Sequence, residues 1–217
     1  MTIDVLGIGF DSISMDEAVS RGLELAEGRT SAIVVTPNAE IVSMCGTDPE
    51  LKEIVNSAEL VLPDGIGIIY GAKLLGRPLK EKVAGIDFGI GVMAELGKRG
   101  GSVYLLGAKP GVAELAAENL CERCPGLRIA GIHDGYFRDD APVIEKINEV
   151  SPDLLLVCLG ASAQEHWMGR NREKLKVGLM AGLGGSMDVY AGQVRRAPKG
   201  WQKLGLEWLY RLLTEPW

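Results

Sequence analysis

The sequence lacks the features expected of a membrane-spanning, secreted or nucleic-acid-binding protein. Its 217 residues contain no run of about 18 apolar residues, and we expect no signal peptide at the N-terminus. Lysine and arginine number 23 against 29 aspartate and glutamate, so the net charge of −6 disfavours a general nucleic-acid binder. We therefore predict a cytoplasmic protein without a nucleic-acid partner.

Motifs for metal or redox chemistry are equally scarce. The four cysteines are scattered, and only Cys121-Glu-Arg-Cys124 has the spacing of a metal site. A zinc site needs about four ligands, and His133 and His166 show no paired spacing. Pro125-Gly126 follows the cysteine pair and would terminate a helix. We therefore interpret the cysteines as structural thiols at a helix end.

The common nucleotide-binding fingerprints are incomplete. Gly7-Ile8-Gly9 begins a GxG after the first apolar run, but no third glycine follows at the required spacing. The position for an acidic residue after the second strand carries Thr36-Pro37-Asn38 instead. No P-loop motif and no Asp-x-Asp occur, so we expect neither a cofactor nor a metal. A transferase of this sequence would neutralise diphosphate with backbone N–H groups and cationic side chains.

Apolar runs alternate with amphipathic stretches along the chain. The runs that predict strands are residues 3–9, 31–35, 59–62, 102–107, 127–132, 153–160 and 177–184. Helical spacing is found between most of them, at residues 15–28, 111–124 and 141–150. Strands that are apolar throughout indicate a sheet covered on both faces. We predict an α/β fold with a doubly wound, mostly parallel, Rossmann-like sheet, in a single domain over residues 1–217.

Polar and small residues follow the predicted strands, where doubly wound sheets bind their ligands. These segments are residues 36–38, 63–65, 107–111, 160–165 and 184–188. Small residues let a ligand approach the backbone, and helix N-termini offer N–H groups to phosphate. We expect the segments to converge on a site for a nucleotide or another phosphorylated compound.

Several of these polar residues also suit purely structural roles. Asn38, within the stretch TPNAEIV, can cap a helix as well as line a site. Asp64 can cap the helix that runs toward Leu75 or act as a general base, and the spacing favours neither reading. Asp87 is a candidate cap for a helix over residues 88–99, and Asp139-Asp140 read as the capping region of the next helix.

Several blocks together resemble a known family. TPNAEIV, LPDGIGI, GASAQEHW, GLGGSMDVYAG, RRAP and GLEWLYRLLTEPW are similar, in this order over residues 36–217, to signature blocks of the WecG/TagA/CpsF family, glycosyltransferase family 26. YLLGAKPGVAE and HDGYF fit between them. The family includes the N-acetylmannosaminyltransferases of wall teichoic acid and enterobacterial common antigen synthesis.

The resemblance implies an inverting, metal-independent transfer of a sugar from a UDP-sugar to a lipid-diphosphate-linked sugar. In the teichoic-acid branch the donor is UDP-N-acetylmannosamine and the acceptor is undecaprenyl-diphosphate-N-acetylglucosamine. Such an enzyme would work at the inner face of the plasma membrane, and a second copy of the chain is a candidate partner. An NAD(P)-dependent oxidoreductase and a non-catalytic nucleotide-binding module are the alternatives.

The resemblance also assigns roles to residues. The proposed base of the family corresponds to Asp64, while Thr36, Asn38 and Gln164 correspond to residues of the same pocket. Charge on the departing UDP would be stabilised by Lys82, Arg196 and backbone N–H groups near Gly185 and Ser186. Arg195 reads better as a surface charge. UDP is expected near three strand-end glycines, Gly107, Gly184 and Gly185.

The chain departs from the family pattern at several places. Lys82 stands where the family commonly has arginine, which removes the planar bidentate fork. Ser162-Ala163 replaces a usual Pro-Lys. Family members continue past Glu-Pro-Trp into a basic, apolar appendage for membrane docking, which we expect to be absent here. Residues 199–217 are predicted to be helical, with an apolar side that packs on the core or forms a membrane or subunit contact: Trp201, Leu204, Trp208, Leu209 and Leu212.

Overall fold

A parallel sheet forms the centre of the computed structural model, which describes residues 1–203 and 205–214. The sheet has six strands in the order β4-β3-β8-β7-β5-β6, and every pairing is parallel. The strands are β3 (Ala32–Val35), β4 (Leu60–Val61), β5 (Ser102–Gly107), β6 (Arg128–His133), β7 (Leu154–Cys158) and β8 (Leu179–Gly182). The predicted doubly wound α/β architecture is confirmed.

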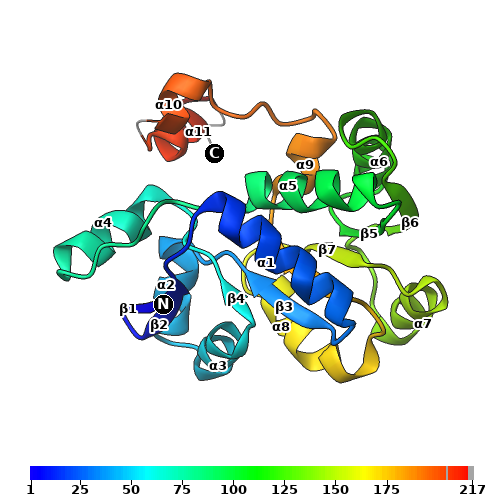
Figure 1. Ribbon diagram of the computed structural model, residues 1–217, viewed down its shortest axis with the longest axis horizontal. Helices are drawn as coiled ribbons and strands as arrows, with labels where there is room; N and C mark the ends of the chain where they lie inside the picture. Colours follow the sequence, from blue (N-terminus) through cyan, green and yellow to red (C-terminus); the bar gives the residue numbers. More distant parts are fainter. Residues whose placement is uncertain (204, 215–217) are drawn as a thin grey trace.

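Helices cover both faces of the sheet, as Figure 1 shows. One face carries α1 (Met15–Gly28), α5 (Gly85–Lys98), α6 (Val112–Arg123) and α9 (Ser186–Tyr190). The other carries α2 (Ala39–Cys45), α3 (Pro49–Ser57), α7 (Asp140–Val150) and α8 (Ala163–Asn171), with α4 (Ile66–Leu74) beside them.

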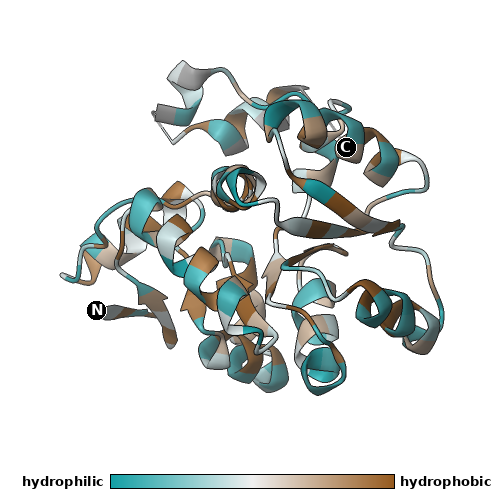
Figure 2. Ribbon diagram, turned by 45° about the vertical axis from the view of Figure 1, so that its right-hand side comes forward, coloured by the Kyte–Doolittle hydropathy of each residue, from teal (hydrophilic) through white to brown (hydrophobic). Residues whose placement is uncertain are grey.

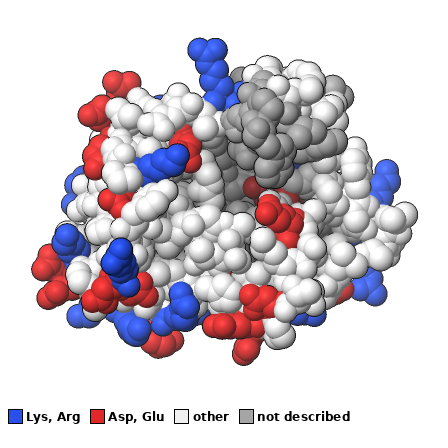
Figure 3. All heavy atoms as spheres, turned by 180° about the vertical axis from the view of Figure 1, so that it is seen from behind, with Lys and Arg blue, Asp and Glu red and all other residues white. Residues whose placement is uncertain are grey.

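Two apolar cores lie between these layers. Neighbouring residues of one strand enter opposite cores, as Val34 and Ile33 do, because side chains alternate along a strand. Hydrophobic residues are accordingly concentrated in the strands and on the inner sides of the helices (Figure 2). Charged side chains of both signs intermingle on the outer surface seen from behind (Figure 3). The apolar patterning thus accounts for the layered arrangement.

The prediction of a first sheet strand over residues 3–9 is wrong, both in the extent of the strand and in the sheet to which it belongs. Residues 3–9 do not join the main sheet but belong to an antiparallel hairpin of β1 (Thr2–Val5) and β2 (Ile8–Asp11). Leu6 and Gly7 form its turn with φ angles of 56° and 84°, both in the left-handed region that a two-residue hairpin turn of type I′ requires. The GxG therefore lies outside the sheet's ligand-binding edge.

Helix ends follow the sequence signals at several positions. Helix α1 has the predicted bounds, Asp139 caps α7, and Cys124 lies at the end of α6. The cysteines are free thiols. Asp87, however, is not a cap, because α5 begins earlier, after Ala84, and Asp87 lies in its first turn.

The N-terminus of α1 makes acid-sensitive contacts. Glu17 accepts hydrogen bonds from Lys80 Nζ at 2.7 Å and from the Ser14 N–H at 2.6 Å. These bonds, that of Lys80 first, lower the pKa of Glu17 from 4.5 to about 2. A carboxylate with a lowered pKa in the folded protein stabilises it above the unfolded value and loses that effect as pH falls through the folded value.

We therefore expect Glu17→Gln to lower the melting temperature modestly at pH 7, and the difference from wild type to vanish as pH falls from 4.5 toward about 2. Thermal unfolding over this pH range measures it. Glu24→Gln on the same helix, which breaks only an exposed pair with Arg21, is the control. A difference that stayed constant with pH would contradict the expectation.

The C-terminal segment forms α10 (Lys199–Lys203) and α11 (Glu207–Thr214). The rings of Trp201 and Tyr210 join them edge to face at 5.8 Å between centroids. The predictions for Leu204 and for the side chains of Trp208 and Leu212 fall outside the described part of the chain, as do residues 215–217. Within the described ranges, no helix combines the length and hydrophobicity needed to cross a lipid bilayer.

Candidate active site

A cavity of about 620 Å³ opens at the carboxyl ends of β3, β4, β7 and β8. The loops after these strands line it together with the C-terminal segment. It brings together nine of the predicted site residues: Thr36, Asn38, Asp64, Lys82, Gln164, Gly184, Gly185, Ser186 and Arg196. The convergence expected from the strand ends is therefore observed for seven of these residues, while Lys82 and Arg196 join them from other loops.

Gly107 is not among the described residues that line the cavity. It ends β5 with a φ of 129°, and a Cβ atom there would lie 2.2 Å from the Cys158 carbonyl oxygen on the neighbouring strand. Such a distance is far below van der Waals contact. The structure thus gives Gly107 a role in the close approach of β5 and β7.

Asp64 lies between β4 and α4, on the cavity wall. It does not cap α4, whose N-cap is Gly65 without a side-chain bond. Its Oδ2 instead accepts the Gly85 N–H at 3.2 Å, at the start of α5. Burial raises the pKa of Asp64, while this hydrogen bond and the charge of Lys82 oppose the rise. A carboxyl group in such surroundings suits proton transfer.

Thr36 and Asn38 of the TPNAEIV stretch form another part of the wall. Asn38 Oδ1 accepts the N–H groups of Glu40 and Ile41, each at 3.0 Å, and so caps α2. The Thr36 hydroxyl donates to the Gly182 carbonyl at 3.3 Å. Both residues line the cavity while holding the strand ends in place, so their structural roles are compatible with the predicted site roles.

Gln164 is buried and its amide is held from both sides. Its Oε1 accepts the Gly184 N–H at 2.9 Å, and its Nε2 donates to Glu165 Oε1 at 2.9 Å. Glu165 is fully buried, which raises the pKa of its carboxyl group, and its Oε2 has no hydrogen-bond partner in the described part of the chain. The pair anchors the loop that carries Gly184.

Ser186 also binds within its own loop. Its hydroxyl donates to the Leu183 carbonyl at 2.7 Å, and the side chain is buried. Gly184 and Gly185 have open space where a Cβ atom would stand. A ligand in the cavity can therefore approach this backbone. The Ser186 N–H, which was predicted to stabilise UDP, already donates to the Leu183 carbonyl at 3.2 Å, so the structure does not offer it as a free donor.

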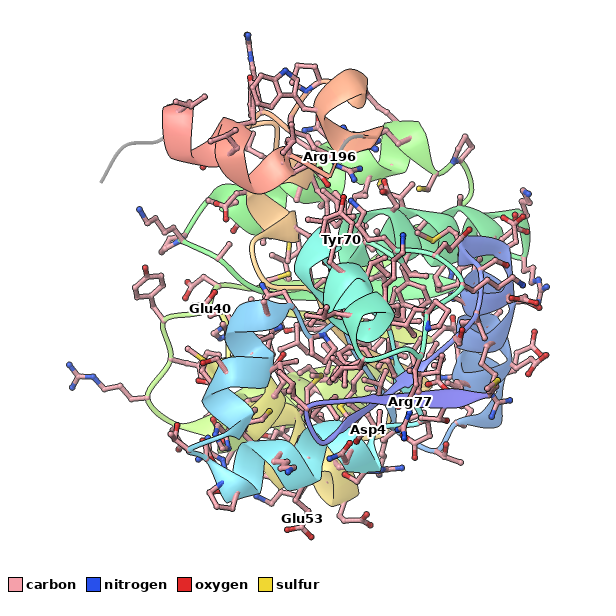
Figure 4. All side chains as sticks on the ribbon, turned by 90° about the vertical axis from the view of Figure 1, so that its left-hand side faces the viewer. Asp4, Glu40, Glu53, Tyr70, Arg77 and Arg196 are labelled. Atoms are coloured by element: carbon pink, nitrogen blue, oxygen red, sulfur yellow. The ribbon has the colours of Figure 1, made fainter. Side chains whose placement is uncertain are left out.

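The two predicted cations are paired with carboxylates. Lys82 Nζ lies 2.7 Å from Glu207 Oε2, and Arg196 Nε lies 3.1 Å from Glu207 Oε1. Both terminal nitrogens of Arg196 also bind the Asp87 carboxylate, one of them at 2.7 Å. Figure 4 shows Arg196 beneath the C-terminal helices, on the same side as Tyr70 of α4. Arg195 is exposed, in agreement with its interpretation as a surface charge.

Sequence reasoning missed Glu207 and Glu165, and gave Asp87 a different role. Burial disfavours the charged form of Glu207, but the bonds and charges of Lys82 and Arg196 outweigh it and lower its pKa. For Glu207, the local sequence offers one signal of a functional role, a lone carboxylate in an apolar stretch. In the described part of the chain, His, Cys, Asp and Glu do not gather in groups of three or more that could hold a metal ion.

Comparison with known proteins agrees with this geometry. A sequence profile of the glycosyl transferase WecG/TagA/CpsF family matches residues 3–217. The chain belongs to this family. Members with a similar sequence are named N-acetylglucosaminyldiphosphoundecaprenol N-acetyl-beta-D-mannosaminyltransferase. The Bacillus spizizenii protein is 37% identical over 85% of this chain and 72% of its own length.

Two further WecG/TagA/CpsF relatives carry the same name. The Bacillus subtilis protein is 33% identical over 87% of this chain and 74% of its own length. The Staphylococcus aureus protein is 31% identical over 98% of this chain and 85% of its own length. The family assignment suggested by the sequence blocks is confirmed.

Proposed function

We propose that this family member transfers N-acetylmannosamine from UDP-N-acetylmannosamine to undecaprenyl-diphosphate-linked N-acetylglucosamine, in the synthesis of wall teichoic acid or a related surface polymer. The names of the relatives support the transferred sugar and the acceptor. The observation that carries the proposal is the placement of Asp64 in one cavity with Lys82 and Arg196. A base and two cations are what glycosyl transfer from a nucleoside diphosphate needs.

Asp64 acts as the general base. Its carboxylate accepts the proton of the acceptor hydroxyl as the hydroxyl oxygen attacks the anomeric carbon of the donor. The bond from that carbon to the UDP oxygen breaks in the same displacement, which inverts the configuration. A positioned base of this kind contributes about 10²–10⁴-fold to the rate.

The departing UDP carries the negative charge that forms. Lys82, Arg196 and the accessible backbone around Gly185 stabilise this charge, without a divalent ion. Thr36, Asn38 and Gln164 form the walls that orient the donor sugar and the acceptor. Because the acceptor is attached to a polyprenyl lipid, we propose that the protein works peripherally at the inner face of the plasma membrane.

The hairpin disfavours the dinucleotide-dependent alternative. A dinucleotide fingerprint places its glycines between a sheet strand and a helix, so that the pyrophosphate meets the helix N-terminus. Gly7 instead forms a hairpin turn, where Asn56 Nδ2 binds its carbonyl at 3.0 Å. The GxG is thus occupied by a structural contact.

The experiment is a transfer assay with purified protein, UDP-N-acetylmannosamine and a short-chain lipid-diphosphate-N-acetylglucosamine. We expect product to form with or without EDTA, and UDP to bind calorimetrically under both conditions. Loss of UDP binding in EDTA would contradict the metal-independent mechanism. UDP binding without any product would favour the non-catalytic module, and binding of NAD(P) without UDP would favour the oxidoreductase.

A further inference from the structure

One carboxylate spans the two cations of the cavity. The Glu207 oxygens bind different partners, Oε2 the Lys82 ammonium at 2.7 Å and Oε1 the Arg196 Nε at 3.1 Å. The three side chains are 21–27% exposed, so solvent screens these pairs less than it screens ion pairs at the open surface. The cations expected to meet a diphosphate are therefore already paired with an internal anion.

The C-terminal segment holds this carboxylate in place. Glu207 is the first residue of α11, and Gly205 precedes it with a φ of 70°. Gly205 lies against Ile66 at the start of α4, where an added Cβ atom would come within 2.6 Å of the Ile66 side chain. All three residues line the cavity. The contact with α4 thus fixes the approach to α11 and, with it, Glu207 beside Lys82.

We propose that Glu207 is an exchangeable occupant of the phosphate subsite, which the diphosphate of the nucleotide displaces from Lys82 and Arg196. The inference rests on the proposed function, because it takes these cations as the diphosphate ligands. An incoming diphosphate brings anionic oxygens that can replace both ion pairs at once. A ligand with its negative charge beside an undisplaced Glu207 would meet like-charge repulsion instead.

Asp87 would keep Arg196 in position during this exchange. It binds the terminal nitrogens of Arg196, whereas Glu207 binds only Nε. Displacement of Glu207 therefore leaves the guanidinium anchored to α5 and still directed by Asp87. Once UDP leaves, the return of Glu207 restores neutral pairs, so the residue sets the affinity for donor and product.

The test is calorimetric titration of wild type and Glu207→Gln with three probes: UDP, inorganic pyrophosphate and uridine. We expect the dissociation constants of UDP and pyrophosphate to fall about 10-fold in the variant, because the competing charge is gone. Uridine lacks phosphates and should bind both proteins alike. Glu95→Gln, which breaks an exposed pair with Lys98 on α5, is the matched control and should change none of the three.

Other results would overturn the inference. Unchanged or weaker UDP and pyrophosphate binding by a normally melting Glu207→Gln would make Glu207 a support for the cations, not a competitor. Glu207→Asp serves as the second variant if glutamine impairs folding, because its shorter side chain cannot span both cations and should also tighten pyrophosphate binding. A wild type that neither binds UDP nor transfers sugar would instead refute the proposed function itself.

Discussion

Asp64→Asn is expected to lower kcat for sugar transfer by about 10²-fold or more, with little change in UDP affinity. The base acts in the transition state, so its loss reduces turnover and spares nucleotide binding. Asparagine has nearly the same shape and can still accept the Gly85 N–H that Asp64 accepts at 3.2 Å. The substitution therefore separates proton transfer from the structural role of the carboxylate.

Steady-state transfer rates, UDP titration and melting temperature are measured together for this variant. Asp139→Asn is the matched control, since Asp139 is an exposed helix cap outside the cavity.

Because burial raises the pKa of Asp64 above the usual 3.8, wild-type kcat/KM should decline with acidification at a higher pH than for an ordinary carboxyl group. The residual activity of the variant should lack this decline. A folded Asp64→Asn protein that kept most of its rate would remove Asp64 from the mechanism.

Gly107→Ala is expected to destabilise the protein by about 3–5 kcal/mol, or to prevent folding. The added methyl group would stand 2.2 Å from the backbone oxygen of Cys158, and a φ of 129° strains any other residue. The contacted atoms belong to the Cys158 backbone, so no flexible side chain can move aside to relieve the overlap. Denaturant unfolding of the purified variant, or its soluble yield, measures the effect.

Gly185→Ala is the matched comparison. Gly185 has a φ of −73° and open space around its Cβ position, so this variant should melt close to wild type. Its methyl group would face the cavity, and any effect should appear in nucleotide binding. A Gly107→Ala protein as stable as Gly185→Ala would show that β5 and β7 can separate, and would return Gly107 to the candidates for ligand binding.

The sequence predicts those features that depend on neighbouring residues. Apolar runs such as 102–107 define strands buried on both faces, and the capping signal of Asp139 defines a helix start. Parallel strands place their carboxyl ends on one edge, so Thr36, Asp64 and Gly184 could be expected in one cavity. The first strand was misjudged because an apolar run does not reveal left-handed φ angles such as those of Leu6 and Gly7.

Only the tertiary structure decides which charged groups meet across the cavity. Lys82 and Glu207 are 125 positions apart, and Asp64 reaches the start of α5 instead of its own helix, 21 positions away. No local pattern encodes these contacts, because they depend on how loops from separate strands and the C-terminal segment converge. Likewise, the sequence predicts that Gly107 faces a ligand, whereas in the structure it packs against the Cys158 backbone. Hydrogen bonds within a turn or helix follow from nearby residues, whereas ion pairs and close strand approaches follow from the packing of the whole chain.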